Sequence, residues 1–481
     1  MAVIFLLLIP NILLIDIPTI SSSYDMHRIF EILLLCSISL LLLLNSNSRK
    51  WWLNYFASFS KTTYYLLISF FLLGLISAIF VAPLPKYAIQ EISLFLLLFV
   101  LAITLASQIQ QDSTQLRMAL VAAIFISITI VSWQFVLEYF FSQLDGSITL
   151  KDNNFFWRFS NLRFFNQFQT WTFPFLALPF LLYYKKIGHW RILLLVPAIF
   201  WWTFWIHSGG RATGVATLIG IVAVLLLFRK KAVPFILFLA GTLLLGLALY
   251  FLMFLEFEKS TGATLIIEKA TDGGLIRVAT KAESQRVAMW LAAFDMSISN
   301  PLLGIGPQQF AFYHPIQDMA HPHNAPLQIM AEWGLPAALS IFFLIIKGAI
   351  QWITNIKQKT VAATTNIDTY LPMALTASFT AAAAHAQLSG IIVMPVSQFT
   401  GVVVIALMLS YFPINTAANN QHNHHHLLLS LFIVVVVTAL LWSVFPEITR
   451  MEEIQKAITT SNSHGGLLHP RFWQQGLTDL Y

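Results

Sequence analysis

The residues best suited to chemistry are His321, His323 and Asn324, which lie directly before an apolar segment that begins near Ile329. Burying an imidazole in hydrocarbon is costly, so histidines at such a position usually line a water-filled cavity or a reaction site. An imidazole there can take a proton from a hydroxyl group or assist a departing phosphate.

Three interpretations of these histidines are open. A metal site is disfavoured because the His321-Pro322-His323 spacing has no acidic or cysteine companion nearby. In a structural role, Asn324 would cap the following helix and the histidines would face solvent. Acid–base chemistry is favoured, because the stretch is predicted to lie on the same face of the membrane as Arg211 and Arg286.

These two arginines are candidates for binding phosphate. Arg211 follows Ser208-Gly209-Gly210 at the start of an apolar segment, and Arg286 lies on a predicted amphipathic helix. A guanidinium matches phosphate oxygens through paired hydrogen bonds, and a helix N-terminus adds partial positive charge. The alternatives are an interfacial anchor for Arg211 and a solvated surface side chain for Arg286.

The composition shows that these residues belong to a membrane protein. Of 481 residues, 58% are hydrophobic and 10% are charged, and the mean hydropathy is +0.74, whereas soluble domains carry roughly 25% charged residues. The net charge of +6 comes from short loops, so no nucleic-acid partner is expected. The single cysteine, Cys36, lies in an apolar run, which excludes a disulfide framework and a cysteine metal site.

We expect an all-α polytopic membrane protein with about 12–13 transmembrane helices, because the apolar runs are long enough to cross a bilayer. The predicted spans are roughly 3–20, 29–45, 64–83, 88–107, 118–141, 171–184, 190–207, 212–228, 233–255, 327–346, 371–388, 397–413 and 427–446. They divide the chain into N-terminal transmembrane helices (1–150), a core (151–346), C-terminal transmembrane helices (347–446) and a polar tail (447–481).

The distribution of lysine and arginine predicts the orientation. Every second loop is basic, as at Arg49-Lys50, Arg229 to Lys231 and Lys357 to Lys359, and such loops stay in the cytoplasm. The segments expected on the opposite face are 142–170, 207–211, 256–326 and the tail 447–481. Loop 256–326 is unusually long for a structureless connection, which favours a function. Its part from Glu283 to Ser299 has the apolar spacing of an amphipathic helix, and a Pro- and Gly-containing turn follows.

Four motifs, in order, resemble the O-antigen ligase and O-antigen polymerase superfamily over roughly residues 160–345. The motifs are Asn166-Gln167, Ser208-Gly209-Gly210-Arg211, Arg286 with Trp290 and the Pro301 to Gly306 turn, and His323-Asn324-Ala325-Pro326-Leu327-Gln328 with Glu332-Trp333-Gly334. The last motif is the most specific. The sequence Phe165-Asn166-Gln167-Phe168 departs from the usual form of the first motif.

The resemblance implies a metal-independent inverting glycosyltransferase of GT-C-like fold in the bacterial inner membrane, with its active site in the periplasm and no cofactor. Its donor would be a glycan on undecaprenyl diphosphate. By the same resemblance, Arg211 and Arg286 would hold the diphosphate. His323 would act in acid–base catalysis, with His321 a weaker candidate. Residues expected to support the cavity are Asn324, Gln328, Asn166, Gln167 and Glu332.

The family leaves the acceptor open. Lipid A–core, as in an O-antigen ligase, ranks first, and a protein acceptor such as a pilin ranks close behind because the tail 447–481 is predicted to lie outside. A growing glycan, as in a polymerase, ranks third. A transporter of lipid-linked glycans is the alternative of another class, but it would place charged groups along a path between the two faces.

Overall fold

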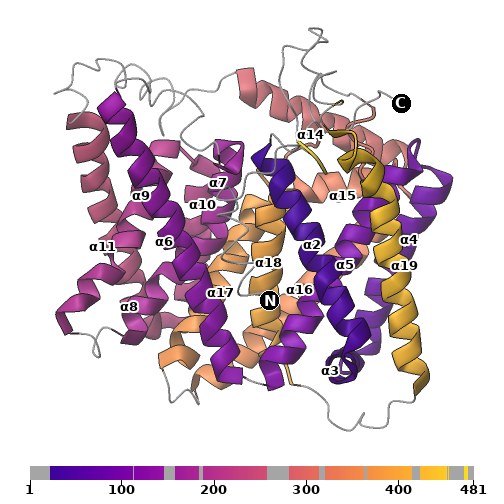
Figure 1. The fold of residues 1–481 in the computed structure, drawn as a ribbon, viewed down its shortest axis with the longest axis horizontal. Helices are drawn as coiled ribbons and strands as arrows, with labels where there is room; N and C mark the ends of the chain where they lie inside the picture. The colour runs from indigo at the N-terminus through magenta and orange to yellow at the C-terminus, as the bar shows by residue number, and fades with distance from the viewer. Residues whose placement is uncertain are drawn as a thin grey trace. The chain divides into compact units, whose positions relative to one another are not determined.

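The computed structural model describes residues 22–111, 113–145, 158–183, 188–256, 281–313, 320–361, 366–413, 423–451, 453 and 471–474 (Figure 1). In these ranges every regular element is a helix. The described residues include eight segments that are long and apolar enough to cross a membrane, so the expected all-α polytopic membrane fold is confirmed. These segments are Ser23–Leu44, Lys61–Phe80, Pro85–Gln111, Thr114–Phe141, Gly188–Ser208, Arg211–Phe254, Leu335–Gln358 and His424–Ile448.

The total of 12–13 spans stays a prediction, since the first predicted span, 3–20, lies outside the described residues. Predicted spans 371–388 and 397–413 correspond to α17 (Asn366–His385) and to the shorter apolar helix α18 (Pro395–Leu409). Predicted span 171–184 is divided among α7 (Leu162–Thr172), a 3-10 turn (Phe173–Leu176) and α8 (Ala177–Tyr183).

The chain forms two compact units, each built from separate stretches of sequence. Unit 1 comprises Met1–Ile15, Gln115–Thr280 and Ile356–His385, and unit 2 comprises Asp16–Thr114, Lys281–Asn355 and Ala386–Tyr481. The division of the chain at residues 150, 346 and 446 stays a prediction.

In unit 1, two pairs of helices carry most of the packing. Helix α10 (Arg211–Phe228) lies along α17, and α9 (Val196–Ser208) lies along α11 (Val233–Tyr250). A hydrogen bond links α9 to α11, because Thr203 Oγ1 donates to the carbonyl of Gly246 at 3.0 Å. The remaining long helix of this unit is α6 (Ser113–Asp145), and short 3-10 or π segments occur at Gly188–Leu194, Arg229–Ala232 and Phe251–Glu256.

In unit 2, helix α5 (Pro85–Gln111) is central and largely buried. It contacts α2 (Ser23–Leu44), α3 (Ser46–Ala57), α4 (Lys61–Phe80), α18 and α19 (Asn423–Ile448). Helix α3 was not among the predicted elements. It is fixed to its surroundings by Trp52, whose indole N–H donates to the Val100 carbonyl at 3.3 Å.

The predicted span 327–346 is wrong as a single helix. Residues Ala325–Trp333 form the short helix α15, and Leu335–Val361 form the spanning helix α16. Between them Gly334 has φ +84°, and a Cβ there would lie 2.5 Å from the Leu302 carbonyl oxygen. The short helix is held by Trp333, whose ring stacks on Phe70 with centroids 4.4 Å apart. The apolar run therefore contains a bend at Gly334. Helix α15, which follows the histidines, precedes the bend, and the spanning helix α16 begins after it.

The predicted amphipathic helix of the long loop is confirmed as α14 (Lys281–Ser299). The predicted turn follows it and contacts α15, because the N–H of Ile305 donates to the Ala331 carbonyl at 2.9 Å. Residues 257–280 of the loop lie outside the described residues.

Candidate active site

The loop that carries the histidines is fastened at the start of α15. Asn324 caps this helix, with Oδ1 accepting the N–H of Leu327 at 3.0 Å. Its Nδ2 donates to the Gln387 carbonyl at 3.1 Å, and the N–H of Ala325 donates to the Ala386 carbonyl at 2.8 Å. The loop is thus bonded to the segment that follows α17 within unit 2.

The two histidines differ in exposure and backbone conformation. His321 is 4% exposed, whereas His323 is half-buried and has φ +53°. The Nδ1 atom of His321 accepts the backbone N–H of His323 at 3.2 Å, and the two ring centroids are 4.2 Å apart. An accepting Nδ1 places the proton of a neutral imidazole on Nε2. The backbone of the loop therefore fixes the tautomer and orientation of His321.

The His321 ring occupies a space that is open because residue 390 is a glycine. A Cβ at this position would lie 2.3 Å from His321 Cε1, closer than any ordinary contact. The ring consequently lies directly against the backbone of the segment between α17 and α18.

Helix α14 also contacts the loop that carries the histidines. The indole N–H of Trp290 donates to the Pro322 carbonyl at 3.0 Å. Arg286 lies one turn earlier and is half-buried, so it shares the face of α14 that contacts the loop. Arg286 therefore lies on the same side of α14 as Trp290.

Further along α15, Gln328 and Glu332 are buried. Gln328 Nε2 donates to Glu332 Oε2 at 3.4 Å, and Glu332 Oε1 accepts the N–H of Phe310 at 3.0 Å. Both residues are at most 3% exposed. They join α15 to the turn that follows α14.

The partner of Glu332 is Arg471, which comes from the described part of the predicted tail. Its Nη2 donates to Glu332 Oε2 at 2.5 Å and to Glu91 Oε2 at 2.7 Å. The same segment makes further hydrogen bonds, among them those from Trp473 to Glu447 at 2.6 Å and from the N–H of Gln474 to Asp25 at 2.7 Å. Residues 471–474 are therefore folded into unit 2.

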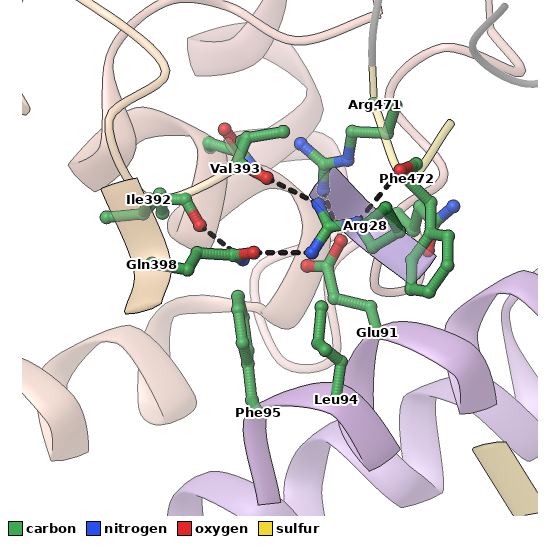
Figure 2. Close-up of a pocket in the computed structure, with 11 residues that line it drawn as sticks. Arg28, Glu91, Leu94, Phe95, Ile392, Val393, Gln398, Arg471 and Phe472 are labelled. Carbon is green, nitrogen blue, oxygen red and sulfur yellow. Dashed lines mark hydrogen bonds and ion pairs between the residues drawn. The ribbon is translucent and has the colours of Figure 1, made fainter. Parts of the chain in front are cut away.

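A second arginine, Arg28 of α2, lines the same small pocket as Arg471 (Figure 2). Arg28 donates to the Phe472 carbonyl at 3.0 Å, the Val393 carbonyl at 2.7 Å and Gln398 Oε1 at 2.5 Å. It also pairs with Glu31. We call the buried set Arg28, Glu31, Glu91, Glu332, Gln398 and Arg471 the arginine cluster.

The arginine cluster contains three carboxyl groups and two guanidinium groups, so one carboxyl is expected to hold a proton. Burial raises the pKa of Glu332 to about 7, an effect that Arg471 opposes and Glu91 reinforces. Burial alone would lower the pKa of Arg471, but the two carboxylates raise it. Because Nε and Nη1 of Arg471 and Oε1 of Gln328 are buried without a partner among the described residues, the pocket has hydrogen-bonding capacity left for water.

In unit 1, the motif around Arg211 is organised by Asn166. The hydroxyl of Ser208 donates to Asn166 Oδ1 at 2.8 Å, and the hydroxyl of Thr213 donates to the Asn166 carbonyl at 2.9 Å. A Cβ on Gly210 would lie 2.6 Å from Asn166 Oδ1. The turn that leads into α10 is therefore shaped by Asn166, and it presents Arg211, which is exposed, as the first residue of the helix.

The Asn166 network extends to His385 at the end of α17. Thr170 Oγ1 lies 2.7 Å from His385 Nδ1 and also donates to the Asn166 carbonyl at 3.0 Å. Gln167, the other residue of this motif, is 1% exposed. The predicted site residues thus form two groups. Arg211, Asn166 and Gln167 belong to unit 1, whereas Arg286, His321, His323, Asn324, Gln328 and Glu332 belong to unit 2.

Sequence reasoning missed Arg28, Glu31 and Arg471. Arg28 and Glu31 stand three positions apart at the start of an apolar helix, a pattern that favours a buried pair. Arg471 offered a weaker signal, its position beside Phe472 and Trp473 in a polar tail. Among the residues that the structure describes, no group of three or more metal-ligating side chains is placed to hold an ion.

Residues 192–342 match the family model described as O-antigen ligase. The matched stretch includes Arg211, Arg286 and His323, and it ends within α16. Comparison with curated proteins gave no match.

Proposed function

We propose that the protein is a membrane glycosyltransferase that uses a glycan on undecaprenyl diphosphate, because residues 192–342 match the family model described as O-antigen ligase. An acceptor hydroxyl attacks the anomeric carbon, the bond from that carbon to the phosphate oxygen breaks, and undecaprenyl diphosphate leaves. The favoured acceptor is lipid A–core at the periplasmic face of the inner membrane. The observation that carries the proposal is the half-buried imidazole of His323 on a loop held outside the membrane spans.

Within this proposal, His323 is the acid–base residue. His321 is buried and its Nδ1 is engaged by the loop backbone, which suits it to positioning. His323 is more accessible, so its ring is the better placed of the two to take the acceptor proton or to assist the departing diphosphate.

Arg211 and Arg286 are proposed to bind the diphosphate. Arg211 is exposed and is the first residue of the 18-residue helix α10, whose N-terminus carries partial positive charge that favours an anion. Arg286 lies on the face of α14 that contacts the histidine loop. Asn324, Gln328, Asn166, Gln167 and Glu332 act as supports for these groups.

The test expresses wild type and His323→Ala in a bacterial strain that makes a lipid-linked glycan and lacks its own ligase. Lipopolysaccharide and periplasmic glycoproteins are then probed for the glycan. His323→Ala is expected to reduce transfer by about 10²–10⁴-fold, whereas substitution of the exposed His189 by Ala leaves it unchanged. Unchanged transfer by His323→Ala at equal protein level would refute the catalytic assignment.

A protein acceptor is the second candidate, supported by the placement of the tail. Arg471 is bonded to Glu332, eight residues after Asn324 in the motif that carries His323. A tail anchored there lies in the unit that carries the histidine loop, where an extension would help to present a protein. Glycan that appears on periplasmic proteins and not on lipopolysaccharide would identify this acceptor.

A further inference from the structure

An apolar cavity of about 640 Å³ opens in unit 2 among α3, α4, α5 and α19. Its wall is almost entirely aliphatic and aromatic, with Trp52, Phe71 and Phe432 among the larger side chains. The volume falls within the roughly 300–1,000 Å³ of typical ligand sites. Because three of the surrounding helices, α4, α5 and α19, are candidate membrane spans, the chemistry that fits this cavity is a hydrocarbon chain.

One end of the cavity is basic. His425 of α19 lines the cavity, and Arg49, Lys50 and His425 are close enough to His426 to influence its charge. Arg49 is already engaged, since its Nη1 donates to the Leu42 carbonyl at 2.8 Å. Lys50 and His425 are exposed. Lys50 is therefore a cation available to a ligand at this end, and the ring of His425 can donate a hydrogen bond to it.

No acidic residue offsets this charge nearby in the sequence. Residues 45–84 and 414–446, which include α3, α4 and most of α19, contain no Asp or Glu. The cavity is apolar, and Lys50 near one end has no acidic residue close to it in the sequence. This combination is complementary to a molecule with an acyl chain and an anionic headgroup.

We propose that this cavity binds an acyl chain of an anionic phospholipid, with the phosphate placed on Lys50 and His425. The positive-inside rule assigns the basic loop at Arg49 and Lys50 to the cytoplasm. The ligand is therefore a lipid of the cytoplasmic leaflet. This site is distinct from the proposed diphosphate site, and it does not depend on the catalytic proposal.

The test measures lipid binding to the delipidated full-length protein in detergent by native mass spectrometry. Phosphatidylglycerol is expected to bind at least about tenfold more tightly than phosphatidylcholine with the same chains. Ala439→Phe fills the cavity and is expected to weaken binding of phosphatidylglycerol by a similar factor. Its matched control is Leu441→Phe, because Leu441 is on α19, is 42% exposed and does not line the cavity.

The charge at the basic end is tested separately. Lys50→Ala is expected to weaken phosphatidylglycerol binding about fivefold, as for one basic residue near a charged surface, and to leave phosphatidylcholine unchanged. Lys230→Ala removes an exposed lysine from unit 1 and serves as the control. Equal binding of the two lipids, or insensitivity of phosphatidylglycerol to both Ala439→Phe and Lys50→Ala, would overturn the proposal. Displacement of phosphatidylglycerol by undecaprenyl phosphate would overturn it in favour of an isoprenoid ligand.

Discussion

Arg471 Nη2 lies 2.5 Å from Glu332 Oε2, and both side chains are at most 1% exposed. This ion pair connects a segment near the C-terminus to the helix that begins at the histidine loop. Glu332 also accepts the N–H of Phe310, so its position is set by three separate parts of unit 2. The arginine therefore contributes to the placement of α15.

Substituting Arg471 by Ala is expected to destabilise unit 2 by about 3–5 kcal/mol, because it leaves the Glu332 and Glu91 carboxylates buried without their partner. Thermal unfolding of the purified protein measures the change. Arg450→Ala is the matched control, since its pair with Glu453 is exposed and worth at most about 1 kcal/mol. If Arg471→Ala unfolds at the same temperature as Arg450→Ala, the buried pair is not important for stability.

Gly390→Ala is expected to displace the His321 ring and reduce glycan transfer, because the new Cβ would lie 2.3 Å from His321 Cε1. The ring cannot move without loss of the bond to the His323 backbone, so we expect a loss of about tenfold or more in rate. Transfer is measured at equal protein level in membranes. Gly348→Ala is the control, as a Cβ there meets nothing within 4 Å. Full activity of Gly390→Ala would show that His321 has no fixed position in the reaction.

The Glu332 carboxyl makes the stability of unit 2 depend on pH. Its pKa is about 7 in the folded protein, against 4.5 for an unperturbed glutamate. Because folding raises this pKa, the protonated carboxyl stabilises the folded protein. This stabilisation is fully present below pH 4.5 and is lost as the pH rises through 7. Relative to Glu332→Gln, which does not titrate, wild type should lose on the order of 3 kcal/mol between pH 4 and pH 8. A difference between the two proteins that is independent of pH would contradict this assignment.

Gly210→Ala is expected to shift the turn before Arg211, because the added Cβ would lie 2.6 Å from Asn166 Oδ1. The predicted effect is weaker binding of the lipid diphosphate donor, seen as a rise in KM for the donor of about tenfold or more. Gly241→Ala is the matched control in the same unit, with nothing within 4 Å of its Cβ. Equal KM values for the two variants would argue against a donor site at this turn.

The long apolar helices were predictable from sequence, because length and hydropathy are local properties. The expected segment 212–228, for example, is helix α10, Arg211–Phe228. The break at Gly334 was not predicted, since the residues on both sides are apolar and the period of the pattern continues through it. Helix α3 was missed for the opposite reason, because it is short and polar.

The arginine cluster shows where sequence reasoning ends. Glu332 was expected from the sequence to support the cavity, whereas Glu91 was not among the expected site residues. Their partner was not identifiable, because the Arg471 contacts cross 380 and 139 residues of sequence. Asn324 as a helix cap was an open alternative, and the structure shows that bond.

The position of Arg471 in the chain has a consequence for biosynthesis. Glu91 and Glu332 are translated and inserted long before Arg471 leaves the ribosome. Until then, both carboxyls lack the cation with which they are paired in the folded protein, so burying them is costly. Docking of residues 471–474 onto unit 2 is therefore the step that pairs these carboxyls, so a chain shortened before Arg471 would expose an unpaired polar interior to membrane quality control.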